Sequence, residues 1–398
     1  YGDHRDLHSF PHDALPIFLT QNFLSLICMS DLRKLIVSVP VADLRSEAKA
    51  APDGLNGPAL SKDIGGQNSQ VLFGEKLISN KSYLGKLQTG EWLNVYALDQ
   101  EVLNAEKKWI GCPGYVQADQ VINIQDFPKY NVVLQDMWTV VYSKQDVLSQ
   151  PVTLLACGTM LEAEKVDNDW WQVYFLGEKF GVIKADSLVY ELASQVKETE
   201  KEIRDKIVII AKKFIGSPYV WGGRTPILQK ELQLSNELPL TGQITGIDCS
   251  DFINIIFKAV GLQVPKNTSS QFYGASKLIE SGKDLRVGDL IFFTRKDDLT
   301  RMCHVMLYIG KNEHGNGEVI ESTGLGVSSI QQAKDAKIDL KRLGVRRIKL
   351  VDYIGVDVDQ IESGKTVYKK RGYFVLMGSY LNSKEDIQKL RDKILFVD

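Results

Sequence analysis

The spacing of apolar residues changes near residue 197, from a strand period to a helix period, and this change limits the folds available to the chain. Before that point, short runs alternate between apolar and polar residues and are separated by Gly and Pro, which is typical of β-strands. After it, apolar residues recur on one helix face, as at Ile203, Ile207 and Phe214. Because 398 residues exceed one ordinary core, we expect several domains, all-β ones first and an α+β one after them.

Two β-rich units are expected ahead of the first long helix, at residues 29–127 and 128–196. Each contains a Trp-x-x-Val-Tyr run followed by a strand that holds a glycine. The same order in both units indicates an internal repeat, and it resembles bacterial SH3-like domains, which are small barrels. These positions are Trp92 and Gly114 in the first unit, and Trp170 and Gly181 in the second.

The rest of the chain is expected to hold an α+β domain at residues 197–355 and a tail at 356–398. Within the domain, strands are expected at 289–294, 304–309 and 318–322, after the helices. The tail reads as one strand followed by one helix. It resembles half of a septal peptidoglycan-binding repeat, but a strand and a helix docked on the preceding domain are favoured, because no second half follows.

The N-terminal segment, residues 1–28, differs from the rest of the chain. Its early charges are mixed, and Ile27 stands directly before Cys28, which is a poor site for lipoprotein processing. We expect that the natural chain starts at Met29 and that residues 1–28 are a non-native or disordered leader. A genuine leader, which would imply export, is the alternative. No later segment reaches the ~18 apolar residues that a membrane span needs.

Composition argues against several classes of function. The net charge is −2, so there is no basic excess of the kind that binds nucleic acid or an anionic membrane. The five cysteines are scattered without a Cys-x-x-Cys pair, so a zinc site or a disulfide framework is not expected. A reducing compartment fits this pattern, and we expect neither a cofactor nor a metal.

Cys249 has the surroundings of a reactive thiol. It follows Asp248 and opens an apolar stretch of helical period that ends near Gly261. A helix N-terminus carries unpaired N–H groups and a partial positive charge, which favour the thiolate. His304 comes later, at the start of a strand-like run. A cysteine followed by a histidine on a strand is the papain-like order of nucleophile and base.

Four ordered blocks carry a family resemblance over residues 198–347. They lie at 218–223, 248–250, 288–293 and 304–310. Their sequences and spacing resemble the NlpC-type papain-like cell-wall endopeptidases. With two SH3-like units in front, the resemblance extends to the subgroup that cuts γ-D-glutamyl–diamino acid bonds in free peptides. It implies an α+β fold, with a papain-like catalytic domain preceded by two small all-β SH3-like barrels.

The resemblance also implies roles for individual side chains. Cys249 is expected to be the nucleophile. Cys303 is the rival thiol, but it adjoins His304 on a strand and therefore points to the opposite face. His304 is expected to be the general base, and Glu321 stands where the family has a polar residue, often histidine, that orients the base. Tyr219 matches the family tyrosine near the oxyanion. The alternatives are structural roles: a buried cysteine, a hydrogen-bonded histidine, an edge-strand glutamate and a core tyrosine.

Substrate contacts are implied at further positions. Glu75 ends a Gln-x-Leu-x-Gly-Glu run that in the family supplies a carboxylate for the free amino end of the substrate. The alternative is a solvated glutamate at a strand end. Asn267 and Thr268 stand where the family has Asp-Ser, so amine recognition is expected to rest more on Glu75. Asp248 and Ser250, which flank the nucleophile, are also expected to contact the substrate.

These expectations describe a cytoplasmic and monomeric cysteine peptidase. Its substrate would be a muropeptide with a free N-terminal L-Ala, cut at the γ-D-Glu–meso-diaminopimelate bond, with no nucleic acid or membrane partner. One alternative is an exported hydrolase of intact cell wall whose SH3-like domains bind the wall. A further alternative is a catalytically inactive binding protein, against which the intact Cys249, His304 and acidic partner argue.

Overall fold

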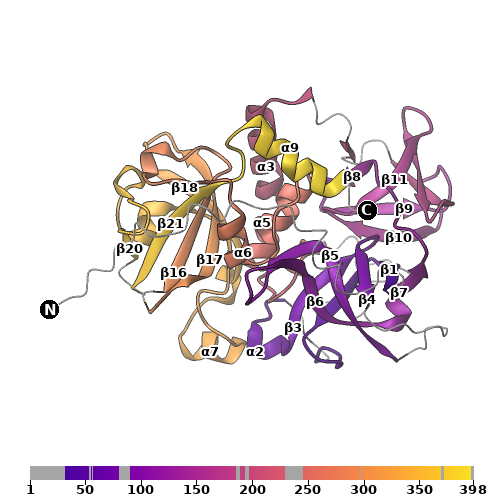
Figure 1. The fold of residues 1–398 in the computed structure, drawn as a ribbon, viewed down its shortest axis with the longest axis horizontal. Helices are drawn as coiled ribbons and strands as arrows, with labels where there is room; N and C mark the ends of the chain where they lie inside the picture. The colour runs from indigo at the N-terminus through magenta and orange to yellow at the C-terminus, as the bar shows by residue number, and fades with distance from the viewer. Residues whose placement is uncertain are drawn as a thin grey trace.

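The chain forms three sheets and several helices. The structure, a computed structural model, describes residues 32–52, 55, 57–79, 90–184, 189–192, 197–228, 245–295, 297–368 and 372–395. Within these ranges the strands make three antiparallel sheets (Figure 1). The expected leader, residues 1–28, lies outside the described residues. Among the described helices, none is long and apolar enough to cross a membrane.

The first sheet has the strand order β3-β2-β6-β5-β4-β1-β7. Its inward side chains, such as Leu35, Val95 and Val116, are fully buried and form a core of their own. The short helix α2 (Ser61–Ile64) lies between β2 and β3 in the sequence. The strands are β1 (Arg33–Val37), β2 (Val41–Arg45), β3 (Gln67–Leu72), β4 (Lys76–Ser79), β5 (Trp92–Leu103), β6 (Trp109–Gln117) and β7 (Val121–Ile124).

The second sheet has the strand order β10-β9-β13-β12-β11-β8-β14. Subtracting seven from each strand number gives the order of the first sheet. The two β units therefore share one strand topology, and the repeat expected from the sequence is visible in it. The strands are β8 (Val132–Leu134), β9 (Trp138–Tyr142), β10 (Pro151–Ala156), β11 (Met160–Lys165), β12 (Trp170–Phe175), β13 (Glu178–Lys184) and β14 (Val189–Glu191).

The repeated glycine lies where two strands of each unit approach closely. A Cβ atom at Gly114, in β6, would come within 2.9 Å of the carbonyl oxygen of Arg45, at the end of β2. A Cβ atom at Gly181, in β13, would come within 2.7 Å of the carbonyl oxygen of Tyr142, at the end of β9. Any side chain would force these backbones apart, so the approach of the two strands explains the glycine in the motif.

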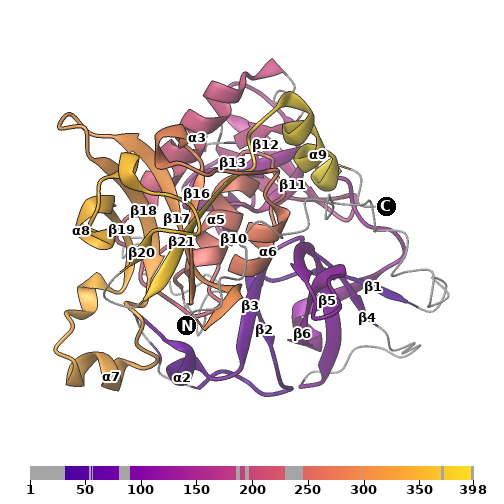
Figure 2. The same ribbon diagram turned by 60° about the vertical axis from the view of Figure 1, so that its left-hand side comes forward.

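The third sheet has the order β15-β21-β16-β17-β18-β19, and β20 pairs with β21. Figures 1 and 2 both place helix α5 near the centre of the molecule, between this sheet and the β units. Helix α3 begins at a capping box formed by Thr199 and Glu202 and shares a core with α5. The helices are α3 (Glu200–Lys213), α5 (Cys249–Lys258), α6 (Thr268–Gly274), α7 (Ile330–Asp335), α8 (Leu350–Ile354) and α9 (Lys384–Leu395). The strands are β15 (Lys277–Leu278), β16 (Leu290–Arg295), β17 (Asp298–Lys311), β18 (Gly317–Thr323), β19 (Gly344–Lys349), β20 (Val367–Tyr368) and β21 (Tyr373–Ser379).

The C-terminal tail belongs to the third sheet. Residues 373–378 of β21 pair antiparallel with β16, and Ile387 and Leu390 of α9 share the core of α5. The tail is therefore a docked strand and helix. The boundary expected at residue 355 does not separate it from the domain, because hydrogen bonding and burial run continuously across that position.

The same turn of each β unit contacts α5. Gly74 joins β3 to β4 and Gly158 joins β10 to β11, both with a left-handed φ, of 78° and 85°. Glu75, after the first glycine, forms an ion pair with Lys258. A Cβ at Gly158 would lie 3.2 Å from the Ile255 side chain. Since Lys258 and Ile255 are both in α5, the two units meet this helix through equivalent turns.

Replacing Gly181 with Ala should destabilise the second β unit. The new Cβ would press on the carbonyl oxygen of Tyr142, and overpacking of this kind costs ~1–3 kcal/mol. Urea unfolding followed by the fluorescence of the tryptophans measures the loss. Lys179→Ala is the matched control, because Lys179 is an exposed residue of the same strand. Equal stability of the two variants would show that the strands do not need a glycine here.

Candidate active site

Cys249 is the first residue of α5, and Asp248 caps that helix. One carboxylate oxygen of Asp248 accepts hydrogen bonds from the backbone N–H of Asp251 at 2.8 Å and from the Ser250 hydroxyl at 3.0 Å. The other accepts one from the N–H of Gly222 at 3.1 Å. Aspartate is among the strongest N-cap residues, so the local sequence itself begins the helix at the cysteine. The partly buried thiol thus lies at the positive end of a helix dipole.

His304 and Glu321 face each other from adjacent strands β17 and β18. Nε2 of His304 lies 2.5 Å from Oε2 of Glu321. Burial alone would lower the pKa of His304, but its hydrogen bonds with Cys249 and with Glu321 outweigh that effect and raise the pKa to about 10. Because Nε2 is engaged by Glu321, Nδ1 is the ring nitrogen left for the thiol. The three residues expected to carry the chemistry are therefore adjacent.

Arg346 is a fourth member of this group that the sequence did not single out. It lies on β19 directly opposite Glu321 in the strand register. Its Nη2 and Nε lie 2.7 and 2.9 Å from Oε1 of Glu321. Burial alone would raise the pKa of Glu321, but the hydrogen bond from His304 and the charge of Arg346 hold that pKa below its usual value. Glu321, which is fully buried, therefore stays ionised between two cations.

Tyr219 and Thr268 lie beside the thiol. The Thr268 hydroxyl is 3.9 Å from Sγ of Cys249. Tyr219 is 7% exposed, and burial followed by the nearby charge of Cys249 raises the pKa of its phenol well above the usual value. The phenol therefore keeps its proton and can donate a hydrogen bond. A Cβ at Gly324 would meet both Leu60 of the first β unit and the Tyr219 ring, so the first β unit borders the site.

Three polar side chains expected at the substrate make bonds within the protein. Asp248 caps α5, Ser250 donates to Asp248, and Asn267 caps α6 by accepting a hydrogen bond from Ser270 N–H at 2.8 Å. These contacts shape the ends of the two helices that frame the thiol. Their expected contacts with substrate stay predictions.

Glu75 lies in a buried network of ion pairs. Its side chain is only 2% exposed. Arg224 Nη1 lies 2.8 Å from each of its oxygens, and Lys258 Nζ lies 2.6 Å from Oε1. Gln100 adds a hydrogen bond of 2.9 Å to Oε2. A buried carboxylate that is already paired with two cations offers little surface to a substrate ammonium, so this geometry does not support the expected contact, which stays a prediction.

The other thiols have different environments. Cys303 is exposed on β17 and donates a hydrogen bond to the carbonyl oxygen of Phe293 at 3.2 Å. Cys112 and Cys157 are buried, and burial raises the pKa of both thiols. Within the described ranges, Cys249 alone joins a thiol to a helix N-terminus and a histidine.

Comparisons with known proteins found similar sequences. Residues 216–346 match the model of the NlpC/P60 family. A curated relative named "Gamma-D-glutamyl-L-lysine dipeptidyl-peptidase" from Bacillus subtilis is 26% identical over 65% of this chain and 73% of its own length. The protein of the same name from Bacillus cereus is 24% identical over 56% of this chain and 60% of its own length. The "Probable endopeptidase p60" of Listeria grayi is 32% identical, but over 30% of this chain and 18% of that protein.

One solved structure resembles the whole arrangement. An NlpC/P60 family protein from Bacillus cereus superimposes with a TM-score of 0.54 and 18% sequence identity. The superposition covers 87% of this chain and 99% of that one. At this identity the likeness concerns the fold alone, and the fold it supports is α+β.

The imidazole of His304 should remain protonated at pH 8. Since its pKa is raised to about 10, above the ~6.5 of an unfolded histidine, its ionisation contributes stability fully below ~6.5. That contribution is lost as the pH rises through about 10. Ring ¹⁵N shifts in NMR spectra between pH 5 and 11 measure the ionisation, and a His304→Gln variant assigns the signal. A neutral ring at pH 8 would contradict the ion-paired geometry.

Proposed function

Because residues 216–346 form an NlpC/P60 domain, we propose that this protein is a cysteine endopeptidase that hydrolyses the γ-D-glutamyl–diamino acid bond of peptidoglycan-derived peptides. The observation that carries the proposal is the group of Cys249, His304 and Glu321. A thiol at a helix N-terminus hydrogen bonds to a histidine, whose other nitrogen is held by a buried carboxylate. The names of the two Bacillus relatives support the choice of bond.

The arrangement can perform both halves of a thiol-protease reaction. The Cys249 thiolate attacks the γ-carbonyl carbon of the glutamyl residue, and a tetrahedral oxyanion forms. We propose that the backbone N–H groups at the start of α5 and the protonated Tyr219 phenol donate hydrogen bonds to that oxygen. The His304 imidazolium then gives its proton to the leaving amine, which leaves a thioester on Cys249.

Hydrolysis of the thioester restores the enzyme. His304, now neutral, takes a proton from water, and the resulting hydroxide displaces the thiolate from the acyl carbon. Glu321 stabilises the imidazolium each time it forms and fixes the ring orientation. Arg346 supports this role by keeping Glu321 ionised.

The proximity of the first β unit to the thiol supports a short peptide as substrate. Ala59 of that unit accepts a backbone hydrogen bond from Trp221 and donates one to Tyr219, at 2.8 and 2.9 Å. We propose that both β units are SH3-like barrels and that the first one limits access to the site. A free N-terminal L-Ala remains part of the proposal, but Glu75 no longer supports it. The exported hydrolase of intact wall is therefore the second candidate.

Two substrates and one polymer test the proposal. The protein is incubated with L-Ala-γ-D-Glu-meso-diaminopimelate, with the same peptide acetylated at its amine, and with whole sacculi, followed by mass spectrometry. The proposal predicts release of L-Ala-D-Glu and diaminopimelate from the free peptide and little action on sacculi. Equal action on sacculi would favour the wall hydrolase, and cleavage of no γ-D-glutamyl bond would end the proposal.

Cys249→Ala should abolish hydrolysis, because the acyl group then has no acceptor on the enzyme. Cys303→Ala is the matched control. That thiol lies on β17, where it donates a hydrogen bond to the Phe293 carbonyl oxygen, and it is not at the start of α5. This variant should keep the parental rate. Both variants should retain the circular dichroism of the parent. An inactive Cys303→Ala together with an active Cys249→Ala would reverse the assignment.

Glu321→Gln should lower kcat by less than His304→Ala does. The amide can still hydrogen bond to the ring, but it no longer stabilises the imidazolium. Loss of a general base typically costs about 10²–10⁴-fold in rate, which sets the upper limit for the glutamate variant. Steady-state rates on the free peptide compare the two. A Glu321→Ala variant as active as the parent would show that another residue orients the base.

A further inference from the structure

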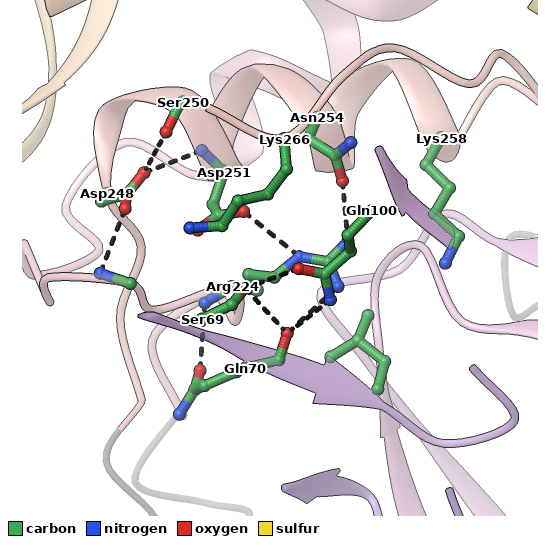
Figure 3. A network of polar contacts seen from close by, with 12 residues as sticks. Ser69, Gln70, Gln100, Arg224, Asp248, Ser250, Asp251, Asn254, Lys258 and Lys266 are labelled. Carbon is green, nitrogen blue, oxygen red and sulfur yellow. Dashed lines mark hydrogen bonds and ion pairs between the residues drawn. The ribbon is translucent and has the colours of Figure 1, made fainter. Parts of the chain in front are cut away.

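Arg224 is a fully buried cation that joins the first β unit to the helix of the nucleophile. Its side chain is 0% exposed. Toward the β unit, Nη1 reaches both carboxylate oxygens of Glu75 at 2.8 Å and the backbone carbonyl of Gln70 at 3.2 Å. Toward α5, Nη2 donates to Asn254 Oδ1 at 2.7 Å, and Nε lies 3.3 Å from Asp251 Oδ1. Figure 3 shows the guanidinium between α5 and the strand that carries Gln70.

The backbone around Arg224 reaches the residue that precedes the nucleophile. Gly222 N–H donates to the Asp248 carboxylate, and Asp248 N–H donates to the carbonyl oxygen of Gly223 at 3.1 Å. Arg224 N–H itself donates to the Gln70 side chain at 3.0 Å. A shift of Arg224 would therefore move the loop that holds the cap of α5, and Cys249 with it.

Glu75 is the anion on which this junction depends. Burial would raise its pKa, but Arg224 and Lys258 hold the pKa at about 2, so the carboxylate is ionised at any working pH. Lys258 is the last residue of α5 and is as deeply buried as its partner. Removing the charge of Glu75 would leave two buried cations facing each other without that counter-ion, which is the most damaging way to break a buried ion pair.

We propose that Glu75, Arg224 and Lys258 form an interdomain clamp that positions α5 and its thiol. In this clamp Glu75 and Arg224 are positioning residues that contact no substrate. The first β unit then acts on catalysis by fixing where Cys249 lies. The activity readout rests on the proposed peptidase function. Since Glu75 does not meet the amino end of the substrate, loss of its charge affects free and acetylated peptides alike.

Glu75→Gln tests the clamp with two independent readouts. On peptides, kcat should fall about ten- to a hundred-fold, the cost of a small misplacement of reacting groups, with little change in KM. The ratio of kcat/KM between the free and the acetylated peptide should stay at the parental value. Without any substrate, the rate at which iodoacetamide alkylates Cys249 should also fall, while the exposed Cys303 reacts as before and serves as an internal reference.

The chain offers a matched control and a compensating variant. Glu101→Gln breaks another ion pair between the first β unit and the domain that holds α5, the pair with Lys393 of α9. It should leave both kcat and the alkylation rate of Cys249 unchanged. Glu75→Gln/Lys258→Gln removes one cation together with the anion and should recover part of the alkylation rate. If Glu75→Gln alone does not fold, the double variant is compared with the parent in its place.

Two results would overturn the clamp. One is a Glu75 variant that folds and alkylates Cys249 at the parental rate. The other is a loss confined to the free-amine peptide, which would return Glu75 to substrate recognition. If the parent itself cuts neither peptide, the proposed function fails, and the alkylation rates still decide whether the clamp positions the thiol.

Discussion

A fully buried arginine has to be neutralised where it lies, and the arrangement of this protein around Arg224 follows from that requirement. The anion comes from the turn after β3, and further acceptors come from α5. Neither part of the chain alone provides a complete set of partners. The β unit and the catalytic helix are therefore tied together by electrostatics as well as by apolar packing.

A buried carboxylate placed between two cations occurs twice near the nucleophile. Glu75 lies between Arg224 and Lys258, and Glu321 lies between His304 and Arg346. In each case two cations outweigh the cost of burying one carboxylate and keep its pKa low. In the active site the carboxylate holds a histidine ring that must change charge. Beside α5, the Glu75 carboxylate pairs with Arg224 and Lys258, whose charges do not need to change during the proposed reaction.

The two β units divide the support of α5 between them. Their identical strand orders bring the same glycine turn to the helix, but the turns carry different chemistry. The first unit contributes a charge. The second packs its turn at Gly158 against Ile255, and its Gln135 side chain donates a hydrogen bond to the carbonyl oxygen of Ala259 at 2.9 Å. The equivalent turn therefore makes a polar contact with α5 in the first unit and a mainly apolar one in the second.

The local sequence was sufficient for the features that depend on neighbours in the chain. Asp248 before an apolar helical run places Cys249 at a helix N-terminus, because capping needs only the next few residues. The strand-like runs at 304–309 and 318–322 predicted that His304 and Glu321 lie on successive strands, and the family resemblance pointed to Glu321 as the partner of the histidine. The glycine of each β unit could be seen in the motif, although the close approach that requires it could not.

Only the tertiary structure decided which charges oppose each other. Glu75 meets Arg224 across 149 residues and Lys258 across 183, and no local pattern reports what faces a carboxylate at such a separation. The family motif therefore suggested a substrate role for Glu75, whereas the structure shows it in buried ion pairs. The sequence did not point to Arg346 for the same reason, since its contact with Glu321 depends on the register of β18 and β19. Propensity and capping act over a few residues, whereas the neutralisation of buried charge is settled only when the whole chain has folded.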